Sequence, residues 1–105
     1  MDPSATAATP RNGADPAPVV TVRYWAAARA AAGCGEEQVR GATVSEVLAA
    51  VRAGHSANAR FEQVLKVSSL LLGEQPLGVG DLSQVAVADG DVLEVLPPFA
   101  GGARP

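Results

Sequence analysis

The chain has 105 residues, of which 48% are hydrophobic, and its formal net charge is −3. This length allows at most one small domain, and the hydrophobic share is typical of a folded protein rather than a disordered one. The eight basic residues are scattered along the chain, which excludes the basic stripe that a nucleic-acid-binding protein needs.

Residues 1–18 consist mainly of Ala, Thr, Pro, Asp and Gly, and they hold four of the eight prolines. Such a segment cannot bury enough apolar area to offset the entropy lost on ordering. We therefore expect a disordered tail over 1–18, followed by one domain over 19–98. The alternative is a regulatory or docking arm.

The domain is predicted to begin with a strand, a helix and a second strand. Apolar residues alternate with polar ones over 19–24, which is typical of a half-buried strand. Residues 26–32 are strong helix formers, and Gly33 is suited to end a short helix there. A second strand is expected over 36–40.

The main helix is predicted to start after Thr43. The pattern Thr43-Val-Ser-Glu46 fits a capping box, in which the two side chains accept hydrogen bonds from free amides at the helix start. Gly54 is expected to end the helix. The apolar residues of this helix fall on one stripe at i, i+3, i+4 and i+7, and they are Val44, Val47, Leu48 and Val51.

The second half of the chain predicts shorter elements. The first is a helix over 57–65 with Phe61, Val64 and Leu65 inward, followed by a strand over 67–72 and a turn over 73–76 that leads to an edge strand near Leu77. An irregular segment or a brief helical turn is expected over 83–88, a tight turn over 89–91 and a last strand over 92–96. This order suits an α+β fold. We expect a mixed sheet packed on one main helix, with the first and last strands paired in parallel at its centre.

Little in the chain predicts independent catalysis. His55 is the one histidine and is expected in a loop, and Cys34, the one cysteine, is expected as a small loop residue. One histidine and one cysteine assemble neither a metal site nor a nucleophile–base set. No apolar run of about 18 residues and no secretory signal occurs. We expect a cytoplasmic protein that is no enzyme by itself, and that binds neither metal, nucleic acid nor membrane.

The segment after the last strand has three parts with different physical properties. Pro97 and Pro98 cannot donate hydrogen bonds to a sheet, so they end the strand and hold the chain extended. Gly101 and Gly102 carry no Cβ, so their backbone could enter a channel too narrow for side chains. An anchored strand, a stiff spacer and a diglycine suit a protein whose own carboxyl group reacts.

Residues 20–32, 43–48, 70–76 and 89–102 together resemble the MoaD/ThiS sulfur carriers, which are ubiquitin-like proteins with the β-grasp fold. The resemblance extends over 19–102. The ending Pro-Pro-Phe-Ala-Gly-Gly is closest to the MoaD branch, the small subunit of molybdopterin synthase, because ThiS members are generally shorter and lack the double proline.

The resemblance implies a mechanism and partners. An adenylating enzyme of the ubiquitin-activating type would use ATP to activate the Gly102 carboxylate, and Gly101 would accompany it into the active site. A thiocarboxylate at Gly102 would then donate sulfur to an acceptor enzyme, with the large subunit of molybdopterin synthase favoured. The carrier itself would bind no cofactor. The residues expected to contact these partners are Leu96, Pro97, Pro98, Phe99 and Ala100.

Residues 103–105, Ala-Arg-Pro, depart from the family pattern, because reactive members end at the second glycine. The resemblance implies that a metallopeptidase cleaves between Gly102 and Ala103. The extension also leaves open a carrier for cysteine, thiamine or other thio-metabolite synthesis. Two further alternatives are a β-grasp interaction module that is never activated and a ubiquitin-like protein tag.

Overall fold

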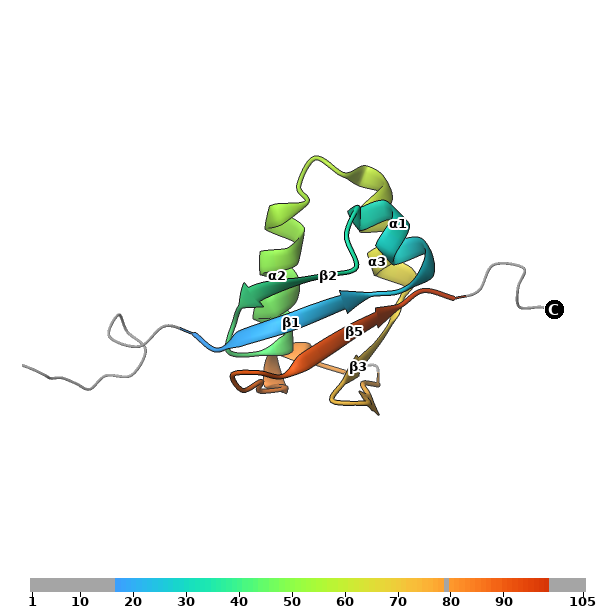
Figure 1. Ribbon diagram of the computed structural model, residues 1–105. Coiled ribbons are helices and arrows are strands. Elements are labelled where there is room, and N and C mark those ends of the chain that lie inside the picture. The colour runs from blue at the N-terminus through green and yellow to red at the C-terminus, as the bar shows by residue number, and fades with distance from the viewer. Residues whose placement is uncertain (1–16, 79, 99–105) are drawn as a thin grey trace, which may run out of the picture.

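The computed structural model describes residues 17–78 and 80–98 (Figure 1). The elements within these ranges are, in chain order, β1 (Val19–Tyr24), α1 (Ala26–Ala32), β2 (Glu36–Arg40), α2 (Val44–Gly54), α3 (Ala59–Val67), β3 (Ser69–Leu72), β4 (Gln75–Pro76), the 3₁₀ turn η1 (Leu82–Gln84) and β5 (Val92–Leu96). The predicted strands 19–24, 36–40 and 92–96 and the predicted helix 26–32 are confirmed.

The strands form one mixed sheet in the order β2-β1-β5-β3-β4. β1 and β5 pair in parallel, from Thr21 opposite Val92 to Tyr24 opposite Val95, whereas the other pairs are antiparallel. Figure 1 shows these two strands side by side in the middle of the molecule. The predicted central pairing of the first and last strands is therefore confirmed, and β5 has a neighbour on each side.

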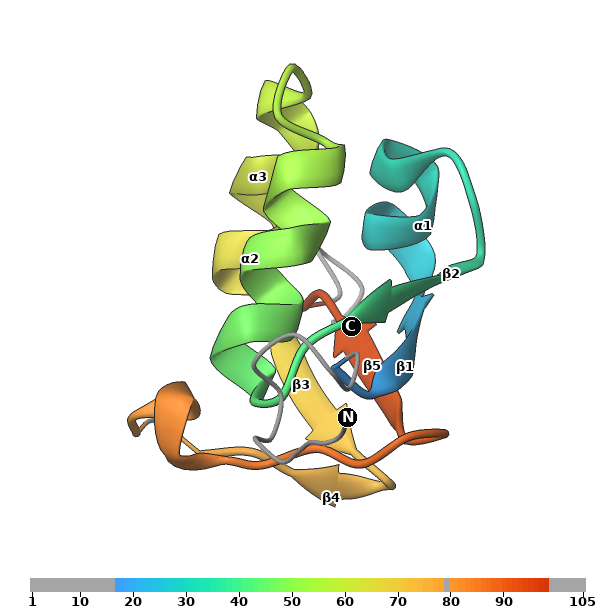
Figure 2. The ribbon, with the colours of Figure 1, turned by 90° about the vertical axis from the view of Figure 1, so that its left-hand side faces the viewer.

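The core lies between one face of this sheet and the helices. Figure 2 shows α2 and α3 on the same side of the strands. Burying one such apolar side chain contributes about 1.5–3 kcal/mol to stability. The largest fully buried side chains are Val20, Val22 and Tyr24 of β1, Val44, Val47 and Val51 of α2, Phe61 of α3, and Leu93 and Val95 of β5.

The start of β5 is fixed by a turn over residues 89–91. Gly90 has a φ of 90°, a value that favours glycine, and its N–H donates to the carbonyl of Val19 at 2.9 Å. The Asp89 carboxylate accepts from the N–H of Val19 at 2.8 Å. The turn thus holds the start of β5 against the start of β1.

Two residues assigned to the tail by the sequence contact the domain. The carbonyl of Pro18 accepts from the N–H of Gly41 at 3.1 Å, and that of Ala17 accepts from the guanidinium of Arg40 at 2.8 Å. These bonds extend the contacts of the domain two residues ahead of β1.

The third helix and the strand after it begin later than the sequence predicted. α3 starts at Ala59 rather than residue 57, because the side chain of Asn58 accepts from the N–H of Phe61 at 2.9 Å and caps the helix. The helix continues to Val67, which was expected in a strand and is 62% exposed. β3 accordingly begins at Ser69.

The cap of the main helix differs in one detail from the predicted capping box. Thr43 Oγ1 accepts from the N–H of Glu46 at 3.2 Å, as expected. The Glu46 carboxylate accepts instead from the N–H of Ala42, at 2.8 Å. α2 includes Gly54 as its last residue, and His55 follows as its C-cap.

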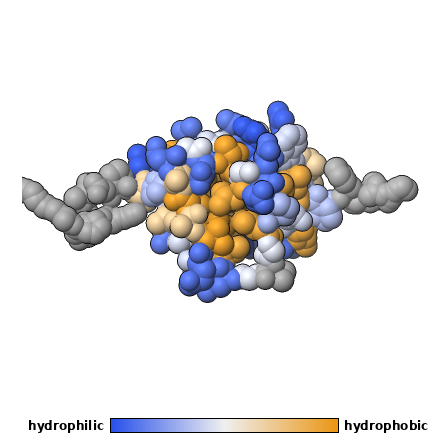
Figure 3. Space-filling view, turned by 90° about the horizontal axis from the view of Figure 1, so that it is seen from below, coloured by the Kyte–Doolittle hydropathy of each residue, from blue (hydrophilic) through white to orange (hydrophobic). Residues whose placement is uncertain are grey.

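Apolar side chains also reach the surface on the side where β3, β4 and η1 lie. Figure 3, which views this side, shows them gathered in the middle between hydrophilic borders. A groove of about 480 Å³ here is lined in part by Leu70, Leu77 and Leu82. Its lining includes Ser69, the residue paired with Leu96, so the groove lies beside the end of β5.

Candidate functional site

The end of β5 is held by backbone contacts from both sides. β1 pairs with it as far as Val95, and β3 pairs with it as far as Leu96. Beyond the end of β1, the N–H of Trp25 still donates to the carbonyl of Val95, at 3.2 Å. The chain that follows Leu96 therefore leaves the domain from a fixed point at the centre of the sheet.

The predicted partner-binding residues differ in their exposure. Alternation along β5 buries Leu93 and Val95 and places Leu96, which is half-buried, on the outer face of the sheet. Pro97 is buried and Pro98 is exposed. Leu96 and Pro98 thus offer surface to a partner, whereas Pro97 packs into the domain. The remaining predicted site residues lie outside the described part of the chain, and they are Phe99, Ala100, Gly101, Gly102 and Ala103.

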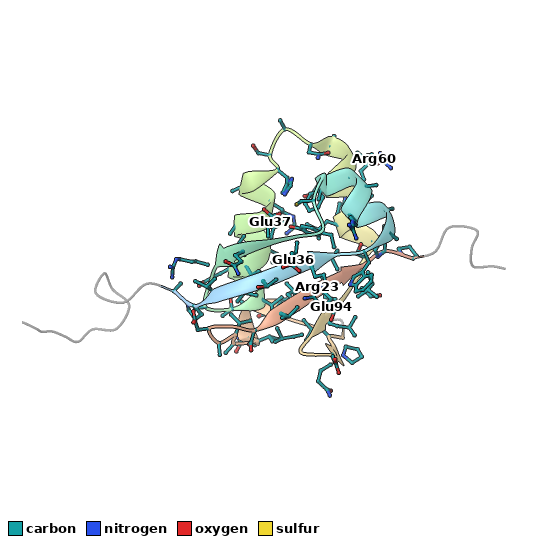
Figure 4. The ribbon with its side chains drawn as sticks, viewed as in Figure 1. Arg23, Glu36, Glu37, Arg60 and Glu94 are labelled. Atoms are coloured by element: carbon teal, nitrogen blue, oxygen red, sulfur yellow. The ribbon has the colours of Figure 1, made fainter. Side chains whose placement is uncertain are left out.

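The outer face of the sheet combines charged and apolar side chains. Glu36, Arg23 and Glu94 occupy neighbouring positions on β2, β1 and β5, and Figure 4 shows these three side chains next to one another. The guanidinium of Arg23 pairs with the Glu36 carboxylate at 3.3 Å. Leu71 of β3 lies opposite Glu94 on the other side. The apolar side chains of this face thus lie on its β3 and β5 side, and the Arg23–Glu36 ion pair lies toward its β2 edge.

Trp25 is a candidate binding residue that the sequence analysis did not single out. Its side chain is 46% exposed, and its indole N–H donates to the Glu94 carboxylate at 3.0 Å. Exposed tryptophans that are held in place often supply much of the energy of a protein interface. The sequence signal was a large aromatic residue where the first strand ends, beside the predicted central partner strand.

A second polar cluster lies on the helix side of the sheet. The Glu37 carboxylate accepts a short hydrogen bond from the hydroxyl of Tyr24 and lies 2.7 Å from Nε2 of His55. The His55 ring stacks on Phe61 with ring centroids 4.3 Å apart. His55 follows α2 as the sequence predicted, but its contact with Glu37 was not foreseen.

Electrostatics assign this cluster a structural role. Burial raises the pKa of Glu37, but the hydrogen bonds from Tyr24 and His55 outweigh that effect, so the pKa lies below its ordinary value. Burial, followed by the hydrogen bond to Glu37, raises the pKa of Tyr24 far above its ordinary value. At neutral pH an ionised carboxylate thus bridges β1, β2 and the end of α2.

The other reactive side chain considered in the sequence analysis, Cys34, is a half-buried free thiol. Burial, and then the charge of Glu37, raises its pKa, which favours the unreactive protonated form at neutral pH. Over residues 17–78 and 80–98, no three potential metal ligands gather at one place, and no helix is both long and apolar enough to span a membrane. The described residues thus provide an exposed sheet face and a fixed exit for the chain.

The mixed sheet, with first and last strands central and helices on one face, defines a β-grasp, ubiquitin-like fold. No protein-family model matches the sequence, and no curated protein matches it. Solved structures do match. The solution structure of small archaeal modifier protein 1 from Methanosarcina acetivorans has a TM-score of 0.67 and 22% identity, over 81% of this chain and 97% of that one.

Two further structures are similar. A chain in the complex of subunits 1 and 2 of molybdopterin-converting factor from Helicobacter pylori has a TM-score of 0.57 and 23% identity, over 80% of this chain and 99% of that one. The crystal structure of small archaeal modifier protein 1 from Haloferax volcanii has a TM-score of 0.65 and 24% identity, over 80% and 99% respectively. The resemblance stated from the sequence is thereby confirmed for the fold.

Proposed function

We propose that this chain is a ubiquitin-like sulfur carrier whose Gly102 becomes a thiocarboxylate. The observation that carries the proposal is the exit of the chain from the central strand β5, which is paired with β1 as far as Val95 and with β3 as far as Leu96. The six residues 97–102 can span about 20 Å when extended. Gly101 and Gly102 are therefore placed by the sequence within reach of a partner's active site while the domain stays on its surface.

The chemistry of the diglycine supports this function. A carboxylate is a poor electrophile, and attack of its oxygen on the α-phosphorus of ATP, with loss of pyrophosphate, turns it into an acyl-adenylate. A sulfur nucleophile held by the partner then displaces AMP at the glycine carbonyl, which no side chain shields. The nucleophile is a persulfide of the partner, so the product is an acyl disulfide. A second thiol of the partner then attacks the partner's own sulfur in that bond, forms a disulfide with it and leaves the thiocarboxylate on Gly102. The partner supplies the ATP site, and the carrier supplies the carboxylate.

The sequence beyond Gly102 requires a processing step. Ala103 occupies the position where a free carboxylate is needed, so the peptide bond after Gly102 must be hydrolysed before adenylation. A metallopeptidase is the proposed agent. Its cut turns an inactive precursor into the carrier.

The acceptor we favour is the large subunit of molybdopterin synthase. Two things support it: the double proline before the diglycine and the similarity to a chain from the Helicobacter pylori complex of subunits 1 and 2 of molybdopterin-converting factor. Transfer to enzymes of cysteine, thiamine or other thio-metabolite synthesis is the alternative for the same carrier chemistry.

The test compares the full chain with a chain ending at Gly102. Each is incubated with the adenylating enzyme of the same organism, ATP and a sulfur donor. Pyrophosphate release is followed, and the mass of each chain is then measured by mass spectrometry. The reaction with the shorter chain should release pyrophosphate from ATP. The mass of that chain should increase by the difference between one sulfur atom and one oxygen atom. The full chain should do neither until a peptidase has trimmed it. Equal activation of the intact full chain would refute the precursor step, and failure of both chains would favour the inert interaction module.

A second candidate function is protein tagging, because two of the similar structures are described as small archaeal modifier proteins. It shares the adenylation step but ends in an amide between Gly102 and a lysine of a target protein. Conjugates that carry Gly102 on a lysine, detected by peptide mass spectrometry after expression in the source organism, would support tagging. A thiocarboxylate without such conjugates would support the sulfur carrier alone.

A further inference from the structure

Glu94 lies on the outer sheet face with apolar residues along its own strand and on β3, and with Arg23 opposite it on β1. It lies on the central strand β5, with Leu71 opposite it on β3. Val92 and Leu96 precede and follow it on the same face of β5, and both are half-buried. A carboxylate in this position is covered by any protein that docks on the face beside the chain exit.

Within the part of the chain that the structure describes, this carboxylate is held in place by a hydrogen bond and takes part in no ion pair. The indole N–H of Trp25 donates to one carboxylate oxygen at 3.0 Å, which fixes its direction. Arg23 lies opposite Glu94 on β1, yet its guanidinium pairs with Glu36 on the other side. Among residues 17–78 and 80–98, the ion pairs present do not include Glu94.

Covering such a group has a clear electrostatic consequence. An ionised carboxylate that loses its water without gaining a cation is strongly destabilising, whereas one that meets a cation in good geometry is not. A docking partner with an apolar or acidic side chain at this point is therefore rejected. A partner with a positive side chain there is accepted. The charge of Glu94 therefore determines which partners bind, more than how tightly they bind.

The neighbouring indole indicates which cation fits. An arginine guanidinium is planar, donates two parallel hydrogen bonds to a carboxylate and stacks on aromatic rings. Glu94 and the 46% exposed Trp25 place a carboxylate and an aromatic ring in direct contact. A lysine ammonium would use the charge but gain less from this pair.

We propose that Glu94, held by Trp25, selects a partner protein that presents an arginine to the outer face of the sheet, and that this partner is the adenylating enzyme. The inference rests on the proposed function for the identity of the partner. The role of Glu94 itself rests on charge complementarity at this face. Glu94 is thus a binding residue on the docking surface, upstream of the stiff spacer that leads to the reacting glycine.

The experiment uses the chain ending at Gly102 with two variants, Glu94→Gln and Glu36→Gln. Glutamine at position 94 keeps the shape of the side chain and an oxygen for the Trp25 indole but removes the charge. Glu36→Gln removes the same charge from an exposed edge of the same face and is the matched control. Thermal melts first verify that both variants fold like the unmodified chain.

Three quantities are then measured with the adenylating enzyme of the same organism: the Kd of the complex, and the kcat and the KM of pyrophosphate release. Glu94→Gln should raise Kd and KM by about tenfold or more and leave kcat unchanged, because it removes one side of a charge pair. Glu36→Gln should change either value by about twofold at most. Added salt should weaken the unmodified complex more than the Glu94→Gln complex.

The possible failures are distinguishable. Equal effects of the two substitutions would show a general charge effect and overturn the proposal, as would an unchanged Kd for Glu94→Gln. A complex that forms and responds to Glu94→Gln without pyrophosphate release would sustain the docking role and count against the proposed carrier function. If the unmodified chain does not bind the enzyme at all, the adenylating enzyme is not the partner and the proposal is refuted.

Discussion

Tyr24 and Trp25 are consecutive residues that hold two carboxylates on opposite faces of the sheet. The hydroxyl of Tyr24 donates to Glu37 on the helix side, and the indole of Trp25 donates to Glu94 on the outer side. Glu37 has His55 as a second partner. Glu94 has no cationic partner among the described residues. The first carboxylate therefore completes the fold, and the second remains available to a partner.

The Glu37 cluster predicts how stability depends on pH. Because the pKa of Glu37 is lower in the folded chain than its ordinary value of 4.5, the unfolded chain takes up protons first as the pH falls. The contribution of Glu37 is complete above that ordinary value and is lost as the pH falls through the folded value. Tyr24, its pKa raised, stays protonated throughout. Acidification should therefore lower the free energy of unfolding.

The substitution Glu37→Gln should cost about 1–3 kcal/mol at neutral pH, since it weakens hydrogen bonds to a charged acceptor. It should also make stability less sensitive to acid in urea melts between about pH 7 and pH 3. Glu36→Gln, next to it on the opposite face of β2, should keep the acid sensitivity of the unmodified chain. An unchanged pH profile for Glu37→Gln would show that other carboxylates govern the acid response.

At the scale of elements, sequence patterns predicted those parts of the structure that depend on local chemistry. The period of two in β1 and the stripe on α2 correspond to their buried side chains. Element ends were less predictable where a side chain from one element bonds another. Asn58 sets the start of α3 and also donates to the carbonyl of Ala31 in α1, at 2.8 Å. Nothing in the local pattern reveals that second bond.

Asn58 should therefore matter more than an ordinary helix cap. Asn58→Ala removes both the cap and the bond to α1, and it should cost about 1–3 kcal/mol. Asn58→Asp keeps an acceptor for the cap but loses the donor to Ala31. Its free energy of unfolding should therefore lie between that of Asn58→Ala and that of the unmodified chain. Denaturant melts measure both. Ser56→Ala, at an exposed position in the same loop, is the control and should stay within about 0.5 kcal/mol of the unmodified chain. Asn58→Ala matching this control would show that neither bond stabilises the fold.

At the scale of the molecule, the order of elements predicted the topology, because a last strand beside the first closes the sheet around one core. The candidate site was only partly predictable. The exposure of Leu96 follows from alternation, but the burial of Pro97 and the contact of Trp25 with Glu94 depend on residues brought together by the whole fold. The latter pair is 69 residues apart in sequence. Such contacts have no local sequence signal.

The whole-molecule arrangement predicts that folding and docking are separable from reaction. All the most buried side chains lie between Val20 and Val95, and the bonds to the carbonyls of Ala17 and Pro18 tie down the chain just ahead of β1. A chain of residues 17–98 should therefore melt within a few degrees of the full chain, about the shift that 0.5 kcal/mol produces in a domain of this size.

The same shortened chain retains Trp25, Glu94 and Leu96 but lacks the diglycine. It should accept no sulfur, and it should inhibit adenylation of the chain ending at Gly102 by competing for the same enzyme. Competition should disappear when the shortened chain carries Glu94→Arg, because the proposed arginine of the enzyme would then meet a like charge. Glu36→Arg, at the edge of the same face, is the matched control and should still compete.

A marked fall in melting temperature of the 17–98 chain would place part of the fold's stability outside these residues. Normal stability without competition would place the docking energy in residues 99–102 rather than on the sheet.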